Sequence, residues 1–317
     1  QIVQADLAAP GKDVFLQGAS HSAQQAVRAA ADPRFAGRVK FLLYGEPSIL
    51  AEAAKRWSGG VLPEVRSAGS LPFAELRVGE ASARCGKLAY DALTMATLDV
   101  LAGKAGALVT APMNKYSVNL SGIPFTGHTE RIAELCGTRN FVMMQSAGDL
   151  RMVFVTTHIP LAEVPRQVTF DRIVNVTRLL DQVVRREGVA RPRLAAAALN
   201  PHAGENGCMG KEDEETVKPA LAALRAEGID IDGPFPPDTL FIEETRRRYD
   251  GIVSMYHDQG HIPFKMLAFD RGVNSTLGLP VVRTSPDHGT AFDIAWKGVA
   301  DTGSFYAAIE LALRRIS

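Results

Sequence analysis

Apolar and polar positions along this chain follow two alternating patterns. Short runs of apolar and β-branched residues predict buried strands, and the stretches between them show the period of three to four residues that is typical of helices. The clearest helical pattern follows Ser82, where Leu88, Ala92 and Ala96 recur every fourth residue. Regular alternation of strands and helices predicts an α/β fold with a largely parallel sheet.

The predicted elements cover most of the chain. Strands are expected at residues 13–16, 39–44, 107–111, 141–145, 152–157, 194–200, 251–256 and 280–283. Besides the helix after Ser82, helices are expected at 22–31, 132–136, 171–187, 212–227 and 305–315. Residues 230–238 contain four prolines and glycines, and we expect them to be irregular because proline lacks a backbone donor and glycine resists both regular structures.

Length and charge limit the architecture and the partners. A chain of 317 residues can form one large core or two of ordinary size. It has no Ser- or Pro-rich linker, so two lobes would be joined directly and not through a flexible tether. Basic and acidic residues number 35 each. This balance gives no support to a nucleic-acid or membrane-surface partner bound through bulk charge. A charged ligand must therefore be bound by local groups.

Cysteine usage and hydropathy point to the cytoplasm. Cys85, Cys136 and Cys208 are too few and too scattered for a disulfide framework. No apolar stretch approaches the roughly 20 residues that span a bilayer. Residues 1–10 lack the basic and apolar segments of a signal peptide. We therefore expect a cytoplasmic protein.

Three histidines stand at or just beyond the ends of predicted strands, namely His158, His202 and His257. In a parallel sheet the carboxyl ends of strands share one edge, so three imidazoles could converge there on a divalent metal. Three imidazole ligands suit zinc best, and cobalt, manganese and magnesium are the alternatives. The alternative is that each is a polar loop residue with its own hydrogen bonds. His261 is expected to be a neighbour of this set.

A second group of residues could bind an anion. His128 and Thr129 lie where a helical pattern begins, and free N–H groups at a helix start attract anions, although Thr129 could simply be an N-cap. Lys265 and Arg283 are embedded in apolar sequence on either side of Asn274, which predicts an anionic partner.

Lys115 is a candidate for proton transfer. It follows the end of a predicted strand, at residues 107–111. If burial lowers its pKa, it could exchange a proton with a substrate oxygen; otherwise it is a simple anion contact.

Several motifs together resemble those of the 4-hydroxythreonine-4-phosphate dehydrogenase family and its close paralogues. They are residues 127–130 (GHTE), 200–205 (NPHAGE), 256–260 (YHDQG) and 271–274 (RGVN), and the resemblance extends from about residue 44 to residue 316. Residues 288–301 look like the adenine-side loop of the isocitrate and isopropylmalate dehydrogenase group, which binds its dinucleotide without a GxGxxG motif.

The resemblance implies an architecture. The fold would be the two-lobed α/β/α fold of isocitrate and isopropylmalate dehydrogenases, with the active-site cleft between the lobes. Residues 1–122 with 281–317 would form a first lobe that carries the cofactor loop. Residues 123–280 would form a second lobe with the metal ligands and the contacts of a homodimer that shares its active sites.

The resemblance also implies roles for individual residues. His158, His202 and His257 would bind the metal across the dimer interface. The other roles fall into three sets: Asp258 for catalysis, beside the candidate Lys115 inferred above from its position; His128, Thr129, Lys265, Asn274 and Arg283 for the substrate; and Asp238, His288, Gly289, Thr290, Ala291 and Asp293 for NAD or NADP.

The implied reaction is metal-dependent oxidation of a secondary alcohol in a phosphorylated 3-hydroxy acid, with decarboxylation. One alternative is a paralogue that acts on a carboxylated cis-dihydrodiol such as that of terephthalate, and a second is a non-catalytic homologue that binds a metal or ligand.

The chain departs from the family at residues 16–22, where a turn of glycine, an acidic residue and proline is usual, and at Trp296, where a small residue is common.

Overall fold

The computed structural model of the protein describes residues 13–17 and 22–316. The expectations for residues 1–10 and for the turn at 18–21 lie outside these described residues. The chain divides into two compact units, here called unit 1 (Gln1–Asn140 and Leu279–Ser317) and unit 2 (Phe141–Gly278). Within the described part of both units, no helix combines the length and the apolar character needed to cross a membrane.

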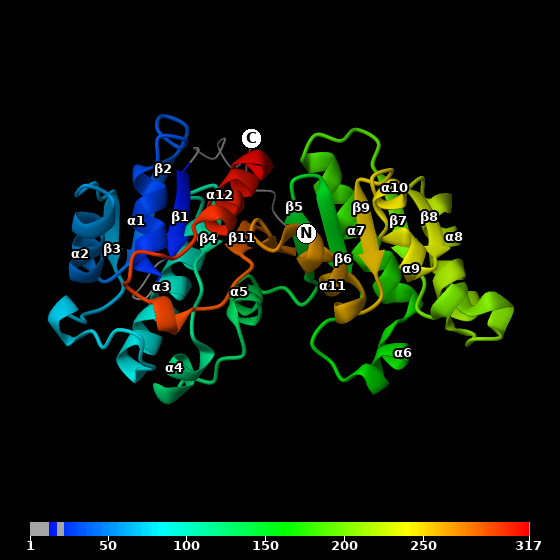
Figure 1. The fold of residues 1–317 in the computed structure, drawn as a ribbon, viewed down its shortest axis with the longest axis horizontal. Helices are drawn as coiled ribbons and strands as arrows, with labels where there is room; N and C mark the ends of the chain where they lie inside the picture. The colour runs from blue at the N-terminus through cyan, green and yellow to red at the C-terminus, as the bar shows by residue number, and fades with distance from the viewer. Residues whose placement is uncertain (1–12, 18–21, 317) are drawn as a thin grey trace. The chain divides into compact units, whose positions relative to one another are not determined.

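Unit 1 contains a parallel sheet covered by helices (Figure 1). Its strands run in the order β3-β2-β1-β4-β11, and neighbouring strands in this order are parallel. They are β1 (Asp13–Gln17), β2 (Lys40–Gly45), β3 (Glu64–Ser67), β4 (Ala107–Thr110) and β11 (Val282–Pro286). The main helices are α1 (Ala23–Ala31), α2 (Pro47–Trp57), α3 (Ala83–Leu101) and α12 (Gly303–Arg315). Helix α3 packs on β1 and β2, and α12 packs on β4 and β11.

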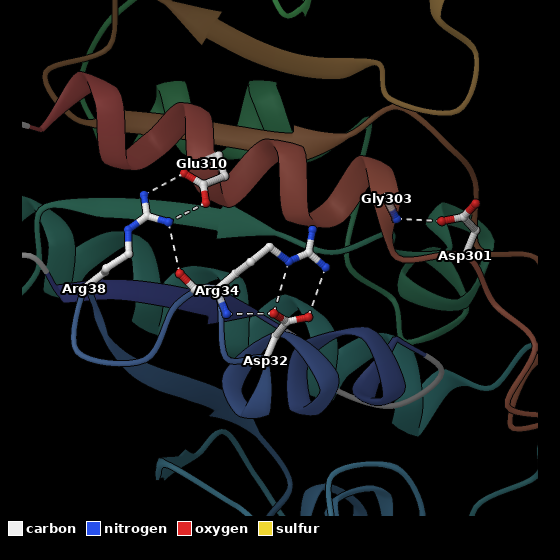
Figure 2. Close-up of polar contacts among 6 residues, drawn as sticks. All are labelled: Asp32, Arg34, Arg38, Asp301, Gly303 and Glu310. Atoms are coloured by element: carbon white, nitrogen blue, oxygen red, sulfur yellow. Dashed lines mark hydrogen bonds and ion pairs between the residues drawn. The ribbon is translucent and has the colours of Figure 1, made fainter.

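Polar contacts attach the segment after α1 to α12 (Figure 2). Arg38 donates to both carboxylate oxygens of Glu310, at 2.8 and 2.9 Å, and Arg34 donates to both oxygens of Asp32 at 3.0 Å. All of these groups are solvent-accessible, so water and salt screen each pair and its contribution to stability is small. The core beneath them, rather than this surface network, therefore stabilises the unit.

Two short helices complete unit 1, α4 (Lys115–Leu120) and α5 (His128–Leu135). Helix α5 packs against α3, where the Arg131 guanidinium lies 4.8 Å from the ring centre of Tyr90. The same guanidinium donates to Thr94 at 3.5 Å. Because of these contacts residues 123–140 belong to unit 1, and assigning residues 123–140 to a second lobe was wrong.

Unit 2 is built on a mixed sheet with the strand order β10-β5-β6-β9-β7-β8 (Figure 1). Strand β5 is antiparallel to β10 and to β6, and the remaining pairs are parallel. The strands are β5 (Val142–Ala147), β6 (Leu150–Phe154), β7 (Arg193–Ala197), β8 (Asp230–Phe235), β9 (Gly251–Ser254) and β10 (Val273–Leu277). The helices are α6 (Val164–Gln167), α7 (Phe170–Arg186), α8 (Lys218–Ala226), α9 (Pro237–Leu240), α10 (Glu243–Arg246) and α11 (His257–Ala268).

Alternate residues of the unit 2 strands contribute to two apolar clusters, as the two faces of a sheet require. Val153 and Ala196 belong to the cluster that includes residues of α7 and α8. Met152 and Ala195 belong to the cluster that includes Phe264 of α11. Helix α11, which begins with a predicted metal ligand, is therefore anchored on the face opposite α7 and α8.

The expectation that residues 230–238 are irregular was wrong for their first part. Residues Asp230–Phe235 form β8, which lies at the end of the strand order and pairs with β7. A proline is tolerated on such an edge strand because one side of the strand has no neighbour, so a backbone donor is not needed there. Gly233 is required for a different reason, since a Cβ there would lie 2.5 Å from the carbonyl oxygen of Ala196.

Candidate active site

A cavity of about 270 Å³ lies in unit 1, beyond the carboxyl end of β4 and beside the end of β11. This is the edge at which parallel α/β sheets bind ligands. Its walls come from residues 110–115, His128, Arg283, Ser285, Pro286 and 288–290. Two residues predicted to bind substrate, His128 and Arg283, thus line one cavity together with Lys115.

Arg283 is the buried cation of this cavity. Its side chain is on β11 and only 4% exposed, and Nη2 donates to the Thr110 hydroxyl at 2.7 Å. Burial lowers the pKa of Arg283 to about 10, against the opposing charge of Glu130, so the guanidinium stays protonated near neutral pH. An anion in the cavity would offset the unfavourable burial of this charge.

His128 begins α5 and presents a neutral imidazole to the same cavity. Burial, followed by the positive charges of Arg283 and Lys115, lowers the pKa of His128 to about 3, while a hydrogen bond with the backbone of Ala111 opposes the shift. Its Nε2 is buried and has no hydrogen-bond partner among the residues that the structure describes. This nitrogen can therefore donate a hydrogen bond to a ligand oxygen or accept one from it, depending on the tautomer.

Lys115 is exposed at the start of α4, whose N-cap Asn114 accepts a hydrogen bond from the Ser117 amide at 2.7 Å. Its ammonium lies beside Gly127, where a Cβ would be 3.5 Å away. The burial that proton transfer would need is absent at Lys115. The arrangement favours the simpler interpretation, in which Lys115 contacts an anion.

Thr129 lies in the first turn of α5, as expected, but it is not the N-cap. The N-cap of α5 is Gly127, so Thr129 is the second residue of the helix and the N-cap interpretation was wrong. Thr129 is half-buried and is not among the described residues that line the cavity. Its role in substrate binding stays a prediction.

The predicted cofactor loop lines two cavities. Residues 288–290 belong to the wall of the 270 Å³ cavity and also to the wall of a smaller cavity of about 40 Å³. His288 Nε2 lies 3.0 Å from Nε2 of Gln25, and its Nδ1 lies 2.9 Å from the carbonyl oxygen of Gly289. Ala291 lines the smaller cavity with a left-handed backbone, φ 45°. The predicted residues His288, Gly289, Thr290 and Ala291 are therefore brought together.

Two other residues predicted to bind the cofactor are not in this group. Asp293 lies in the short turn Phe292–Ile294 and is not among the described residues that line either cavity. Asp238 is exposed in the first turn of α9 in unit 2. Their contacts with a cofactor stay predictions.

Trp296 forms part of the wall of the smaller cavity. It is buried, with φ 60°, and its ring centre lies 4.9 Å from Trp57 and 4.8 Å from Phe73. Its indole Nε1 is buried and lacks an acceptor within the described part of the chain. A buried donor without an acceptor in this wall can donate a hydrogen bond to a ligand, such as a ring nitrogen in the base of a dinucleotide.

In unit 2 two of the three predicted metal ligands lie side by side. The ring centre of His257, the first residue of α11, is 5.3 Å from that of His158. His257 also stacks on His261 at 4.0 Å, and His261 stacks on Phe154 at 4.4 Å. This stacking gives His261 the neighbouring position expected of it.

Asp258 contacts the imidazole of His257. Its Oδ1 lies 2.6 Å from His257 Nδ1, and its side chain is 72% exposed. A carboxylate in this position fixes the ring orientation and leaves Nε2 available as a ligand. The contact favours an orienting role for Asp258, whose predicted part in catalysis stays untested.

His202 is not gathered with the other two imidazoles. Its side chain is 62% exposed, and its Nδ1 lies 3.6 Å from a carboxylate oxygen of Glu205. Over residues 13–17 and 22–316 of one chain, no three His, Cys, Asp or Glu side chains form a group that could hold a metal. The three imidazoles therefore do not form one group within the described part of a single chain, and one chain supplies only part of a donor set for a divalent metal. A site shared between two copies stays a prediction.

The loop that carries His202 has an unusual backbone. His202, Ala203, Glu205 and Asn206 have φ values of 51°, 55°, 43° and 55°, and Gly204 between them has φ 78°. A left-handed conformation costs about 1–2 kcal/mol for each residue with a side chain. Such a turn persists only where the surrounding structure holds it.

The other predicted substrate residues lie in unit 2. The ammonium of Lys265 is 5.4 Å from the ring centre of Phe269, and Asn274 is half-buried in β10. They stay predictions. Sequence reasoning missed Thr110, Asn114 and Ser285, which line the unit 1 cavity. The usable signals were the strand-end positions of Thr110 and Ser285 and the position of Asn114 just before a helix.

Comparison with known proteins links this geometry to a family. The family profile described as pyridoxal phosphate biosynthetic protein PdxA matches residues 20–312. A 4-hydroxythreonine-4-phosphate dehydrogenase of Caulobacter vibrioides is 52% identical over 221 residues, which are 68% of this chain and 66% of that protein. A D-threonate 4-phosphate dehydrogenase of Pectobacterium atrosepticum is 44% identical over 239 residues, 75% of this chain and 73% of that protein.

A solved structure agrees with these matches. The crystal structure of 4-hydroxythreonine-4-phosphate dehydrogenase from Klebsiella pneumoniae is 36% identical, with a TM-score of 0.82, over 97% of this chain and 100% of that one. The resemblance drawn from the motifs, the α/β fold class and the oxidoreductase class are thereby confirmed. The chain belongs to the pyridoxal phosphate biosynthetic protein PdxA family.

Proposed function

We propose that this protein is a metal-dependent NAD(P) dehydrogenase that oxidises a secondary alcohol in a small phosphorylated 3-hydroxy acid, with decarboxylation. The observation that carries the proposal is the unit 1 cavity, where Arg283, Lys115 and the neutral ring of His128 surround space for an anion. The two relatives compared above are named for substrates with a phosphate group. A phosphate with two negative charges matches this donor set.

Each residue of the cavity would have a distinct task. Arg283 is held by Thr110 and offers a planar donor group to phosphate oxygens. Lys115 adds a point charge from the start of α4. His128 stays neutral and donates or accepts one hydrogen bond, so it orients the phosphate without adding charge. Together they fix one end of the substrate.

The predicted metal would be held by His158, His202 and His257, with zinc as the best match and cobalt, manganese or magnesium as alternatives. When bound, such a metal supplies Lewis acidity that lowers the pKa of a chelated hydroxyl. Asp258 would keep His257 in the orientation that exposes Nε2. Two copies of the chain would contribute to each site.

A homodimer is supported by an apolar stripe on α11 and the residue after it. Ile262, Met266 and Phe269 are 59%, 82% and 76% exposed. They follow the spacing of one helix face, and such contiguous apolar surface marks an interaction site. The same helix begins with His257, so a second copy seated on the stripe would approach the imidazoles.

The dinucleotide would lie along residues 288–291 and Trp296, in the space that adjoins the anion cavity. A bound nicotinamide ring supplies the hydride acceptor. The cavity walls do not favour NAD over NADP. The shared walls of the two cavities support a cofactor and a substrate bound in adjoining space.

The test is a turnover assay with purified protein, each divalent metal, and NAD or NADP. The substrates are 4-hydroxythreonine 4-phosphate, D-threonate 4-phosphate and the cis-dihydrodiol of terephthalate, which represents the alternative function. We expect kcat/KM for a phosphorylated acid to exceed that of the dihydrodiol by about 100-fold, the effect of one or two charge-assisted hydrogen bonds. Preference for the dihydrodiol, or no turnover at all, would contradict the proposal.

A further inference from the structure

We propose that Asp213 is a positioning residue for the metal site, because it holds the left-handed turn at residues 202–206 that presents His202. The inference rests on the proposed function, in which His202 is a metal ligand. It goes beyond that function by naming the side chain that sets the position of the ligand. Asp213 would act through the backbone of residues 199 and 200.

The contacts of Asp213 carry the argument. Asp213 is fully buried at the start of the helical turn Asp213–Val217, ahead of α8. One carboxylate oxygen accepts from the Leu199 amide at 2.7 Å, and the other accepts from the Asn200 amide at 2.9 Å. A buried carboxylate needs such donors, and charge-assisted hydrogen bonds are among the strongest in proteins. The carboxylate thus fixes the chain just before the left-handed turn.

A second set of contacts closes the loop from its other side. The Asn200 side-chain amide donates to a carboxylate oxygen of Glu212 at 2.8 Å. A Cβ at Gly204 would lie 3.0 Å from the Gly210 carbonyl oxygen and 3.5 Å from Cβ of Asp213. The middle of the turn therefore rests against Asp213 itself, in space that only glycine leaves free.

These contacts explain how the strained turn persists. Four residues with side chains adopt left-handed conformations there, and each would relax if the surrounding structure did not hold it. The His202 ring is mostly exposed, so its position depends on the backbone that carries it more than on packing. Loss of the Asp213 carboxylate should release the turn and move the imidazole.

The experiment compares three variants of the full-length protein. Asp213→Asn removes the charge and one of the two acceptors. Asp181→Asn is the matched control, because Asp181 is also a buried carboxylate of unit 2 but lies on α7 and pairs with Arg185 at 2.7 Å. His202→Ala removes the ligand itself. Visible-absorption titration with Co²⁺ reports both metal affinity and coordination geometry, and amide hydrogen exchange reports the loop.

We expect Asp213→Asn to weaken Co²⁺ binding by about 10–100-fold, to change the absorption band, and to speed exchange at residues 199–210. Asp181→Asn should leave all three readouts as in the parent protein. If Asp213→Asn fails to fold, Asp213→Glu keeps the carboxylate but displaces it by one methylene. That variant should show the same changes at reduced size.

Two outcomes separate this inference from the proposed function. If His202→Ala abolishes Co²⁺ binding while Asp213→Asn binds Co²⁺ like the parent, or leaves exchange unchanged, the positioning role is wrong and the ligand set stands. If His202→Ala binds Co²⁺ like the parent, the ligand set is wrong and the positioning role falls with it. An equal loss of Co²⁺ affinity in Asp213→Asn and Asp181→Asn would also overturn the inference. The loss would then follow from removing any buried carboxylate of unit 2 and would not be specific to Asp213.

Discussion

The anion cavity of unit 1 and the imidazoles of unit 2 differ in how complete they are within one chain. The cavity already combines Arg283, Lys115 and His128 around a single space. Of the three predicted metal ligands, His158 and His257 are neighbours, whereas His202 projects from an exposed turn. Within one chain the groups predicted to bind an anion therefore lie together, whereas the groups predicted to bind a metal do not.

The largest effect that would sharpen this comparison is expected from His257→Ala. Losing one of three ligands should remove the metal and reduce kcat/KM by about 10³-fold, since a Lewis acid contributes several kcal/mol. The anion cavity should be unaffected. Metal content and turnover check the first part, and stabilisation of the protein by the phosphorylated substrate in thermal denaturation checks the second. Loss of both together would mean that the two regions are not independent.

The next effect is the converse, from Arg283→Met. This change keeps much of the side-chain volume and removes the charge, so KM for the phosphorylated substrate should rise by about 10–100-fold. Metal content should stay constant. Arg315→Met, at another buried arginine of unit 1 on α12, is the control and should leave KM unchanged. An unchanged KM in Arg283→Met would show that the phosphate binds elsewhere.

The pH dependence of stability tests the buried imidazole of unit 1. The pKa of His128 is about 3 in the folded protein and about 6.5 when unfolded, so below pH 6.5 the unfolded state binds the extra proton. The free energy of unfolding should therefore fall with decreasing pH, by about 2 kcal/mol at pH 5 from this group alone. Urea unfolding of the protein and of His128→Asn at pH 5 and pH 8 measures it. If the variant loses as much stability on acidification as the parent, the group responsible is another one.

The smallest effect concerns the indole of Trp296 beside the cofactor loop. Trp296→Phe keeps an aromatic ring and removes the donor, so the Kd for the preferred dinucleotide should rise about fivefold, the effect of one neutral hydrogen bond. Nicotinamide mononucleotide, which lacks the adenosine half, should bind equally to both proteins. Trp57→Phe is the control. Equal weakening for both ligands would place Trp296 away from the adenine.

The strand–helix alternation was sufficient to predict the α/β class, whereas the two-lobed architecture came from the family resemblance. The errors of the pattern have physical reasons. Residues 230–235 have turn composition but form an edge strand, where the missing donor of proline does no harm. Helix α11 was missed because Gly260 and Pro263 lie within it and its N-cap Tyr256 has no capping side chain. Strand β10 was missed because its sequence VNSTL is largely polar although four of its five residues are buried.

The candidate site could be predicted in part. His128 and Arg283 were predicted to contact the substrate. They line the same cavity, which lies at the carboxyl edge of the parallel sheet. The position of His202 could not be read from the sequence, since it belongs to a run of five left-handed residues. The chain just before that run donates two backbone hydrogen bonds to Asp213, which lies 11 residues beyond His202. A contribution from a second chain likewise leaves no periodic signal in the sequence of the first.

The central claim, that the metal site is built from two chains, can be tested by mixing two inactive variants. His202→Ala and His257→Ala are each purified, combined, allowed to exchange subunits, and assayed for bound metal and turnover. Random exchange makes half of the dimers mixed, and a shared site leaves one of two sites intact in each, so about a quarter of the parent activity should return. If all ligands came from one chain, every site would stay defective, and a mixture that exchanges subunits but remains inactive would contradict the account.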